Sequence, residues 1–288
     1  MNTTLETASS SDEFFREYTS QDAILKYTRA TAGYGISYLL DHDYKAVYLD
    51  AVALLPPEIR QRGIRLLEFG CGGGMNLVHL VALLERHTTR VEAGIGTDFS
   101  PVLIEAAKRE AANYLRPDQS RNISFHIAKN ETLMEDLRTS LNTDIATLRS
   151  SFHLILGVNT IRYCHRAKKE LDCARDIFDL LAPGGVCLII DMNDRFPLFR
   201  SALKARLRGP QETEEECYIP SLAEYTAPFE TAGFEVLRSD HFCWVPHSAG
   251  RSMCRLFSVL SPLLNGVARS RAMRSLVVAR KPPRPDNR

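Results

Sequence analysis

The chain has 288 residues, enough for one large domain or a domain with additional elements, and its apolar and charged fractions are those of an ordinary globular protein. Lys and Arg number 36 against 35 Asp and Glu, so the formal net charge of +1 argues against a dedicated nucleic-acid binder. No apolar run is long enough to span a bilayer and the N-terminus has no signal pattern, so we expect a cytoplasmic protein without membrane contact.

The seven cysteines are spread along the chain without a CxxC pair. This spacing favours reduced thiols over a disulfide framework or a zinc site. His241 and His247 have a spacing that metal ligands can adopt, but no nearby carboxylate completes a site. We therefore predict no bound metal.

The first 60 residues have no strand pattern. Residues 1–11 are rich in Ser and Thr and are predicted to be a disordered tail. Residues 12–60 have helical periodicity, which predicts a helical N-terminal cap; Tyr44, Val47, Tyr48 and Val52 fall on one face. Pro56-Pro57 is predicted to end this region.

From residue 63 onward, short apolar runs alternate with helical stretches. The predicted strands are 64–69, 91–98, 123–128, 152–157 and 186–191, and the predicted helices are 76–87, 101–115, 133–147 and 168–181. Two late strands are predicted at 233–237 and 275–281. Continuous apolar strands separated by helices indicate an α/β, doubly wound, mostly parallel sheet. The connections 192–224 and 241–274 are predicted lid insertions, and 282–288 a tail.

A glycine-rich turn, Gly70-Cys71-Gly72-Gly73-Gly74, directly follows the first strand and precedes a helix. Glycines permit positive φ and let a ligand lie against bare backbone. In open α/β sheets, ligands bind at the carboxyl ends of the strands, where this turn lies. Standing alone, the turn has a plain alternative as a tight strand-to-helix connection.

The next strand ends in a carboxylate, Asp98, followed by Phe99. At the neighbouring strand tip, Asp98 could accept hydrogen bonds from both hydroxyls of a ribose. Phe99 could pack on an adenine face. The alternative is that Asp98 caps the helix that starts near Pro101.

Four segments, LLEFGCGGG, GIGTDFSPVLIEAAK, FHLILGVNTI and LLAPGGVCLII, occur in this order and spacing. Together they resemble the successive motifs of class I S-adenosylmethionine (SAM)-dependent methyltransferases, over about residues 63–191. The resemblance implies a Rossmann-like, seven-stranded sheet whose last strand is antiparallel, and a SAM-binding domain over 61–281. A dinucleotide-binding fold is disfavoured because its fingerprint needs glycine where Met75 stands.

The resemblance also implies roles for single residues. Glu68 and the backbone of Gly70, Cys71 and Gly72 would hold the methionine end of SAM, Asp98 the ribose and Phe99 the adenine. After the third strand, Asn130 or Glu131 would meet the adenine amino group, in a segment that departs from the commoner Gly-Asp. Val158 and Asn159 would flank the cofactor next to the acceptor.

The loop after the fourth strand, 159–166, is the expected transfer site, and its candidate catalytic residues are Arg162, Tyr163 and His165. Tyr163 or His165 could position or deprotonate an acceptor hydroxyl. Arg162 could clamp a carboxylate. The alternatives are a solvated helix start for His165 and a surface salt bridge for Arg162. The segment 241–247 is a second candidate wall of the acceptor site.

These features predict methyl transfer from SAM to an oxygen, nitrogen or carbon of a small-molecule acceptor, with no nucleic-acid partner. The alternatives are a methyltransferase that acts on RNA or protein, and a SAM-binding protein without transferase activity. The apolar segment 256–264 is predicted to form either another lid or a homodimer surface.

Overall fold

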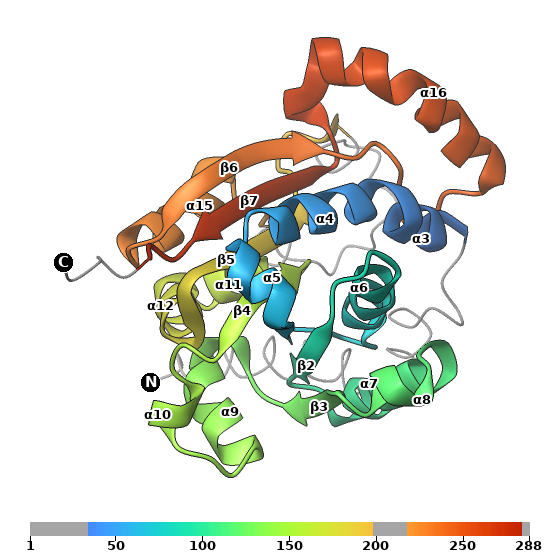
Figure 1. Cartoon of the computed structure of the whole chain (residues 1–288). Coiled ribbons are helices and arrows are strands. Elements are labelled where there is room, and N and C mark those ends of the chain that lie inside the picture. Colours follow the sequence, from blue (N-terminus) through green and yellow to red (C-terminus); the bar gives the residue numbers. More distant parts are fainter. Residues whose placement is uncertain (1–33, 198–217, 284–288) are drawn as a thin grey trace, which may run out of the picture.

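The computed structural model describes residues 34–197 and 218–283 (Figure 1). The predictions for the tail 1–11, for cap residues before Tyr34 and for most of the 192–224 insertion lie outside these residues. Within them, the cap is helical: α3 (Tyr34–Leu39) continues through one π-helical turn, η1 (Leu40–Tyr44), into α4 (Lys45–Ala53).

The prediction that Tyr44, Val47, Tyr48 and Val52 share one face agrees with the structure, in which all four side chains are buried. The expectation for Pro56-Pro57 needs one correction. The helix does end before the pair, but Pro57 also begins a further short helix, α5 (Pro57–Arg62). Proline suits this first helical position because its fixed φ is compatible with a helix and no N–H is lost there.

The sheet has seven strands in the order β3-β2-β1-β4-β5-β7-β6. Their bounds are β1 Ile64–Phe69, β2 Val91–Asp98, β3 Ile123–Ile127, β4 Phe152–Val158, β5 Leu181–Met192, β6 Glu235–Phe242 and β7 Arg274–Arg280. The first five strands are parallel, and β7 pairs antiparallel with both β5 and β6. The predicted fold class and the antiparallel last strand are therefore confirmed.

Helices cover both faces of the sheet, and a separate apolar core lies between the helices and the sheet on each face. The cap helices, α6 (Met75–Arg86) and α7 (Pro101–Tyr114) pack on one face. The opposite face carries α9 (Leu133–Ser140), α10 (Ile145–Leu148), α11 (Ile161–Arg166), α12 (Glu170–Leu180) and α15 (Leu222–Thr231). The described chain also contains two 3-10 turns, η2 (Asn130–Thr132) and η3 (Arg269–Arg271).

Three predicted elements differ from the structure by more than two residues at one end or are divided. The helix predicted over 133–147 is broken into α9 and α10, because Asn142 adopts φ +48° after α9 ends. β5 begins at Leu181 instead of 186. β6 runs on to Phe242 instead of ending at 237, since this polar, half-exposed stretch pairs with β7 despite its weak apolar pattern.

The connection predicted as a lid over 241–274 contains a long helix, α16 (Arg251–Ala268), which lies beside α3 (Figure 1). It buries Cys254 and exposes a stripe of large apolar side chains, Met253, Leu256, Val259, Leu263 and Val267. Within residues 34–197 and 218–283, no helix is long and apolar enough to cross a membrane.

Six of the cysteines fall in the described ranges, and all six are buried free thiols. Across the same ranges, no three His, Cys, Asp or Glu side chains gather in a way that could hold a metal ion.

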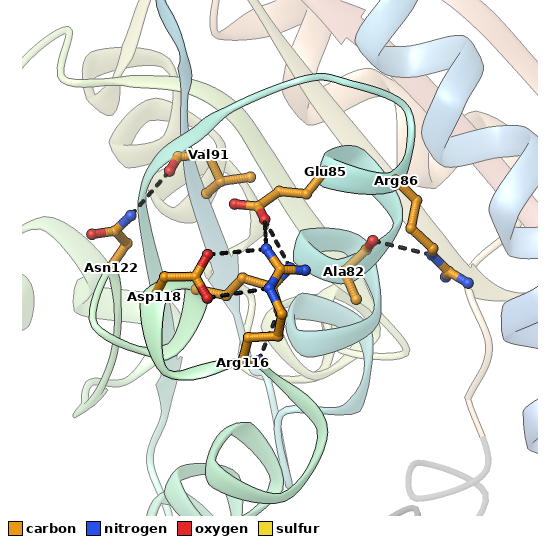
Figure 2. Close-up of polar contacts among 8 residues, drawn as sticks. Ala82, Glu85, Arg86, Val91, Arg116, Asp118 and Asn122 are labelled. Atoms are coloured by element: carbon orange, nitrogen blue, oxygen red, sulfur yellow. Dashed lines mark hydrogen bonds and ion pairs between the residues drawn. The ribbon is translucent and has the colours of Figure 1, made fainter.

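At the β3 edge, surface ion pairs fasten α8 (Pro117–Ser120) to α6, as Figure 2 shows. Arg116 contacts Glu85 at 2.9 Å and Asp118 at 3.0 Å, with its side chain 61% exposed. Exposed pairs of this kind contribute little to stability.

Candidate functional site

The glycine turn forms a compact loop between β1 and α6. Gly70, Gly72 and Gly74 all have positive φ, of 60°, 52° and 78°. A Cβ on Gly70 would lie 2.0 Å from Thr160 Oγ1, so this glycine is required by a contact within the protein. The N–H of Cys71 donates to the Thr97 carbonyl at 2.7 Å, which ties the loop to β2. The loop backbone is partly exposed at Gly70 and Gly72, where a ligand could reach it.

Asp98 lies directly against this loop. Its Oδ2 accepts a hydrogen bond from the Gly72 N–H at 2.9 Å, and its Oδ1 accepts one from the Ser100 N–H at 2.9 Å. Burial raises the pKa of the carboxyl, and the two N–H groups counteract that shift. Each oxygen keeps a further lone pair for a ligand hydroxyl. The structure thus brings together the loop and the carboxylate that the sequence singled out separately.

The capping role considered for Asp98 belongs to its neighbour. Ser100 is the N-cap of α7, and its hydroxyl accepts from the Leu103 N–H at 3.3 Å. Phe99 stands between the two and is half-buried. The helix therefore does not need the Asp98 side chain as its cap.

Glu68, at the end of β1, has no exposed surface. Its two oxygens accept from Asn76 Nδ2 at 3.2 Å and from the Leu77 N–H at 2.9 Å, at the start of α6. Asn76 in turn accepts from the Tyr48 hydroxyl of α4 at 3.0 Å. Glu68 supports the loop and the cap through these partners, and its implied role at the methionine end of SAM stays a prediction.

The burial of Glu68 predicts that the stability of the protein depends on pH. Burial raises the pKa of this carboxyl to about 8, although the hydrogen bonds from Asn76 and Leu77 lower it in part. A carboxyl with a raised pKa keeps its proton in the folded state after the unfolded state has lost it. Its stabilising contribution is therefore complete below about pH 4.5 and is lost as pH rises to about 8, a change of about 5 kcal/mol.

We expect Glu68→Gln to flatten this dependence, because the amide is uncharged at every pH and the Asn76 amide can turn to meet it. Urea unfolding at intervals from pH 4.5 to 8.5 measures the effect. The surface variant Glu105→Gln, whose parent side chain is 60% exposed, serves as the control. A Glu68→Gln protein with the same slope as wild type would contradict this account.

The two candidates for the adenine amino group take different positions. Asn130 donates through Nδ2 to Thr160 Oγ1 at 2.6 Å, and the same nitrogen lies near the Cβ position of Gly70. It therefore borders the loop. Glu131, the next residue of η2, is half-buried. The structure thus gives Asn130, of the pair, a defined contact beside the loop.

Beyond β4, a buried polar cluster occupies the carboxyl edge of the sheet. Val158 ends the strand with 8% exposure, and Asn159 adopts φ +58°. Arg162 Nη1 donates to the Asn159 carbonyl at 2.9 Å and pairs with Asp191 Oδ1 at 2.6 Å. The Asp191 side chain is fully buried and that of Arg162 is 13% exposed, so the surface salt bridge considered for Arg162 is in fact a buried one.

Tyr163 belongs to this cluster, whereas His165 does not. Arg162 Nη2 donates to the Tyr163 hydroxyl at 2.8 Å, and the guanidinium stacks 4.4 Å from the ring centre. The His165 ring instead meets Tyr225 edge-on at 5.6 Å. It lines a surface pocket between α11, α12 and α15 with Glu170 and Glu224. Burial lowers the pKa of His165, against the pull of these two carboxylates.

The residues of the second candidate wall, 241–247, also lie in different surroundings. His247 reaches the cluster, where its Nε2 lies 2.7 Å from Arg274 Nη2. Burial, Arg274 and Arg162 lower the pKa of His247 to about 3, so the ring is neutral and accepts this bond. Trp244 donates to Asn265 of α16 at 2.8 Å and serves packing, the more common role for such a residue.

Sequence reasoning missed two members of the cluster, Asp191 and Arg274. In the sequence, Asp191 follows the apolar run of VCLIID, just as Asp98 stands at the end of β2. This similarity could have identified Asp191 as a site residue. Arg274 stands before the late strand in a polar run, and only the antiparallel pairing of Arg274 with Met192 brings it to the carboxyl edge.

Residues 40–239 match a family described as "Methyltransferase domain", which is more than half of the chain. No curated protein matches the sequence.

Solved structures share the fold at low identity. An S-adenosylmethionine-dependent methyltransferase from Mesorhizobium loti has 20% identity and a TM-score of 0.51, covering 84% of this chain and 99% of that one. The [4+2]-cyclase SpnF has 15% identity and a TM-score of 0.51, covering 84% and 81%. A possible exported protein from Bordetella parapertussis has 17% identity and a TM-score of 0.53, covering 94% and 79%. The chain therefore belongs to the methyltransferase-domain family, and the prediction of a class I SAM-dependent methyltransferase is confirmed. This membership implies SAM as its cofactor.

Proposed function

We propose that this protein transfers the methyl group of SAM to an oxygen, nitrogen or carbon of a small-molecule acceptor. The observation that carries the proposal is the contact between Asp98 and the Gly72 N–H, which fixes a carboxylate beside a partly exposed glycine loop. Asp98 would hold the ribose hydroxyls, Phe99 the adenine face, and Asn130 or Glu131 the adenine amino group. The loop backbone at 70–72, supported by Glu68, would hold the methionine end.

SAM, when bound, supplies an electrophilic methyl group on a good leaving group. The protein's main task is then alignment, from which about 7–11 kcal/mol is available. A base is needed only when the accepting atom must lose a proton. Val158 and Asn159 would border the transferring group, and Arg162 and Tyr163 would fix the acceptor. His165 would serve an acceptor that also occupies the pocket by α15.

Two observations favour a small acceptor over RNA or protein. Two of the three transfer-site candidates, Arg162 and Tyr163, lie in a cluster whose Asp191 and Arg274 are buried, as is Tyr44 of the cap. The net charge of +1 offers no general attraction for a polyanion. A cytoplasmic location without nucleic-acid or membrane partners is part of the same proposal. The apolar stripe of α16 supports either a lid or a homodimer contact.

The expected result is that the protein binds SAM and S-adenosylhomocysteine with micromolar affinity by calorimetry. With methyl-labelled SAM, label should pass into small molecules of a metabolite extract and not into purified RNA or protein fractions. Label found only in RNA or protein would reject the small-molecule acceptor.

A second candidate is a SAM-binding protein with another activity. The similarity to the fold of SpnF, a [4+2]-cyclase, favours keeping this candidate, because one fold can host unrelated chemistry. Tight SAM binding without label transfer to any fraction would support it over the proposal above.

A further inference from the structure

Arg274 is a buried cation that forms no ion pair with any residue that the structure describes. It begins β7 at the carboxyl edge of the sheet and is 4% exposed. Its Nη1 donates to Asn159 Oδ1 at 2.6 Å, and its Nη2 donates to the neutral His247 ring at 2.7 Å. Both partners are uncharged. Burying a charge with only neutral partners is costly, which points to a missing anion.

The other guanidinium of the cluster shows the contrast. Arg162 has the Asp191 carboxylate at 2.6 Å. Over residues 34–197 and 218–283, no carboxylate oxygen lies within ion-pair distance of Arg274. These three side chains therefore carry two positive charges and one negative charge.

Two buried donors, one on Arg274 and one on Tyr44, also lack acceptors. Arg274 Nε and the Tyr44 hydroxyl are buried, and neither has a hydrogen-bond partner among the residues that the structure describes. The two side chains act on each other, since the charge of Arg274 opposes the burial that raises the Tyr44 pKa to about 12. Tyr44 therefore keeps its proton and remains a donor. An oxygen anion placed between the two side chains would supply the acceptor that each donor lacks.

The strand order places this pair on the acceptor side of the site. The glycine loop follows β1, whereas Arg274 begins β7, three strands farther along the sheet. Neighbouring strands lie about 4.8 Å apart, which separates β1 from β7 by roughly 14 Å. Between them lies Asn159, which bonds both arginines.

We propose that Arg274 and Tyr44 bind a carboxylate of the methyl acceptor, so that the acceptor is an anionic small molecule. This inference rests on the proposed function for the identity of the ligand. The anion-binding property of the pair does not, and it can be measured without SAM.

Acetate and its neutral counterpart acetamide are suitable probes of equal size. Acetate should raise the thermal midpoint of the wild type in a saturable way, whereas acetamide should not. Arg274→Gln should weaken the apparent acetate affinity about 10- to 100-fold, and Tyr44→Phe about 3- to 10-fold. Arg280→Gln, which changes an arginine at the opposite end of the same strand, should leave it unchanged.

Equal effects of acetate and acetamide, or equal acetate affinity in wild type and Arg274→Gln, would overturn the inference. If Arg274→Gln does not fold, Tyr44→Phe decides, together with Arg274→Lys, which keeps the charge and should bind acetate within about threefold of wild type.

A second measurement separates the acceptor from the cofactor. Arg274→Gln should bind both S-adenosylhomocysteine and 5′-methylthioadenosine, which lacks the carboxylate, within about twofold of wild type. A loss of tenfold or more for S-adenosylhomocysteine alone would assign Arg274 to the cofactor's carboxylate and reject the acceptor assignment. A wild-type protein that binds acetate but no S-adenosylhomocysteine would instead refute the proposed function.

Discussion

Replacing Asp98 by alanine should weaken S-adenosylhomocysteine binding by about 100- to 10,000-fold. In the proposed function its carboxylate accepts from two ribose hydroxyls, and charge-assisted bonds of this kind contribute about 1.5–3 kcal/mol each. Calorimetry on the wild type and the variant measures the change. Asp118→Ala, at an exposed carboxylate of the α8 surface, should bind like wild type.

The loss could also come from the loop, because Asp98 holds the Gly72 and Ser100 N–H groups. A ligand cycle separates the two causes. The wild type should discriminate strongly between S-adenosylhomocysteine and its 2′,3′-dideoxy analogue, whereas Asp98→Ala should bind both about equally. If the folded variant keeps the full discrimination, the ribose is held elsewhere and the cofactor placement is wrong.

Asp191→Ala should destabilise the protein by about 3–5 kcal/mol. The substitution removes the carboxylate that Arg162 contacts through both its side chain and its N–H, and leaves a buried guanidinium uncompensated. It also removes the acceptor of the Met192 N–H. Urea unfolding of the wild type and the variant, fitted with a common m-value, measures the difference in unfolding free energy.

The surface pair of Arg149 and Asp179 provides the comparison, since both side chains are well exposed. Asp179→Ala should cost less than about 1 kcal/mol. In an Arg162→Met background, Asp191→Leu should recover much of the lost stability, because an apolar pair replaces an ion pair. A cost below 1 kcal/mol for Asp191→Ala would show that Arg162 finds another counter-charge.

The order of elements could be predicted from the sequence because strands buried on both faces have continuous apolar runs. The sequence does not predict the ends of helices and strands where local backbone features or strand pairing decide them. The positive φ of Asn142 divides a helix whose apolar pattern continues, and β6 extends through polar residues because β7 offers a partner. Neither effect is visible in periodicity.

For the candidate site, residues next to a motif could be identified and residues brought in by tertiary pairing could not. Asp98 and Gly72 are adjacent to recognisable strand ends, and the structure places them in contact. Arg274 is 115 residues from Asn159, its hydrogen-bond partner. A local pattern carries no information about such a contact. His165 shows the converse: its sequence position indicated the transfer loop, yet one helical turn directs it toward α15.

The chain of hydrogen bonds from Tyr48 through Asn76 to Glu68 has an evolutionary consequence. Tyr48 and Glu68 are buried and Asn76 is half-buried between them, so the loss of a polar group at one position leaves the next with an unmet donor or acceptor, at a cost of about 1–3 kcal/mol. Selection should therefore retain or exchange the three positions as a set, although they lie on a cap helix, on α6 and on a central strand. The cap helix that carries Tyr48 and the segment around the glycine turn should therefore change together in evolution.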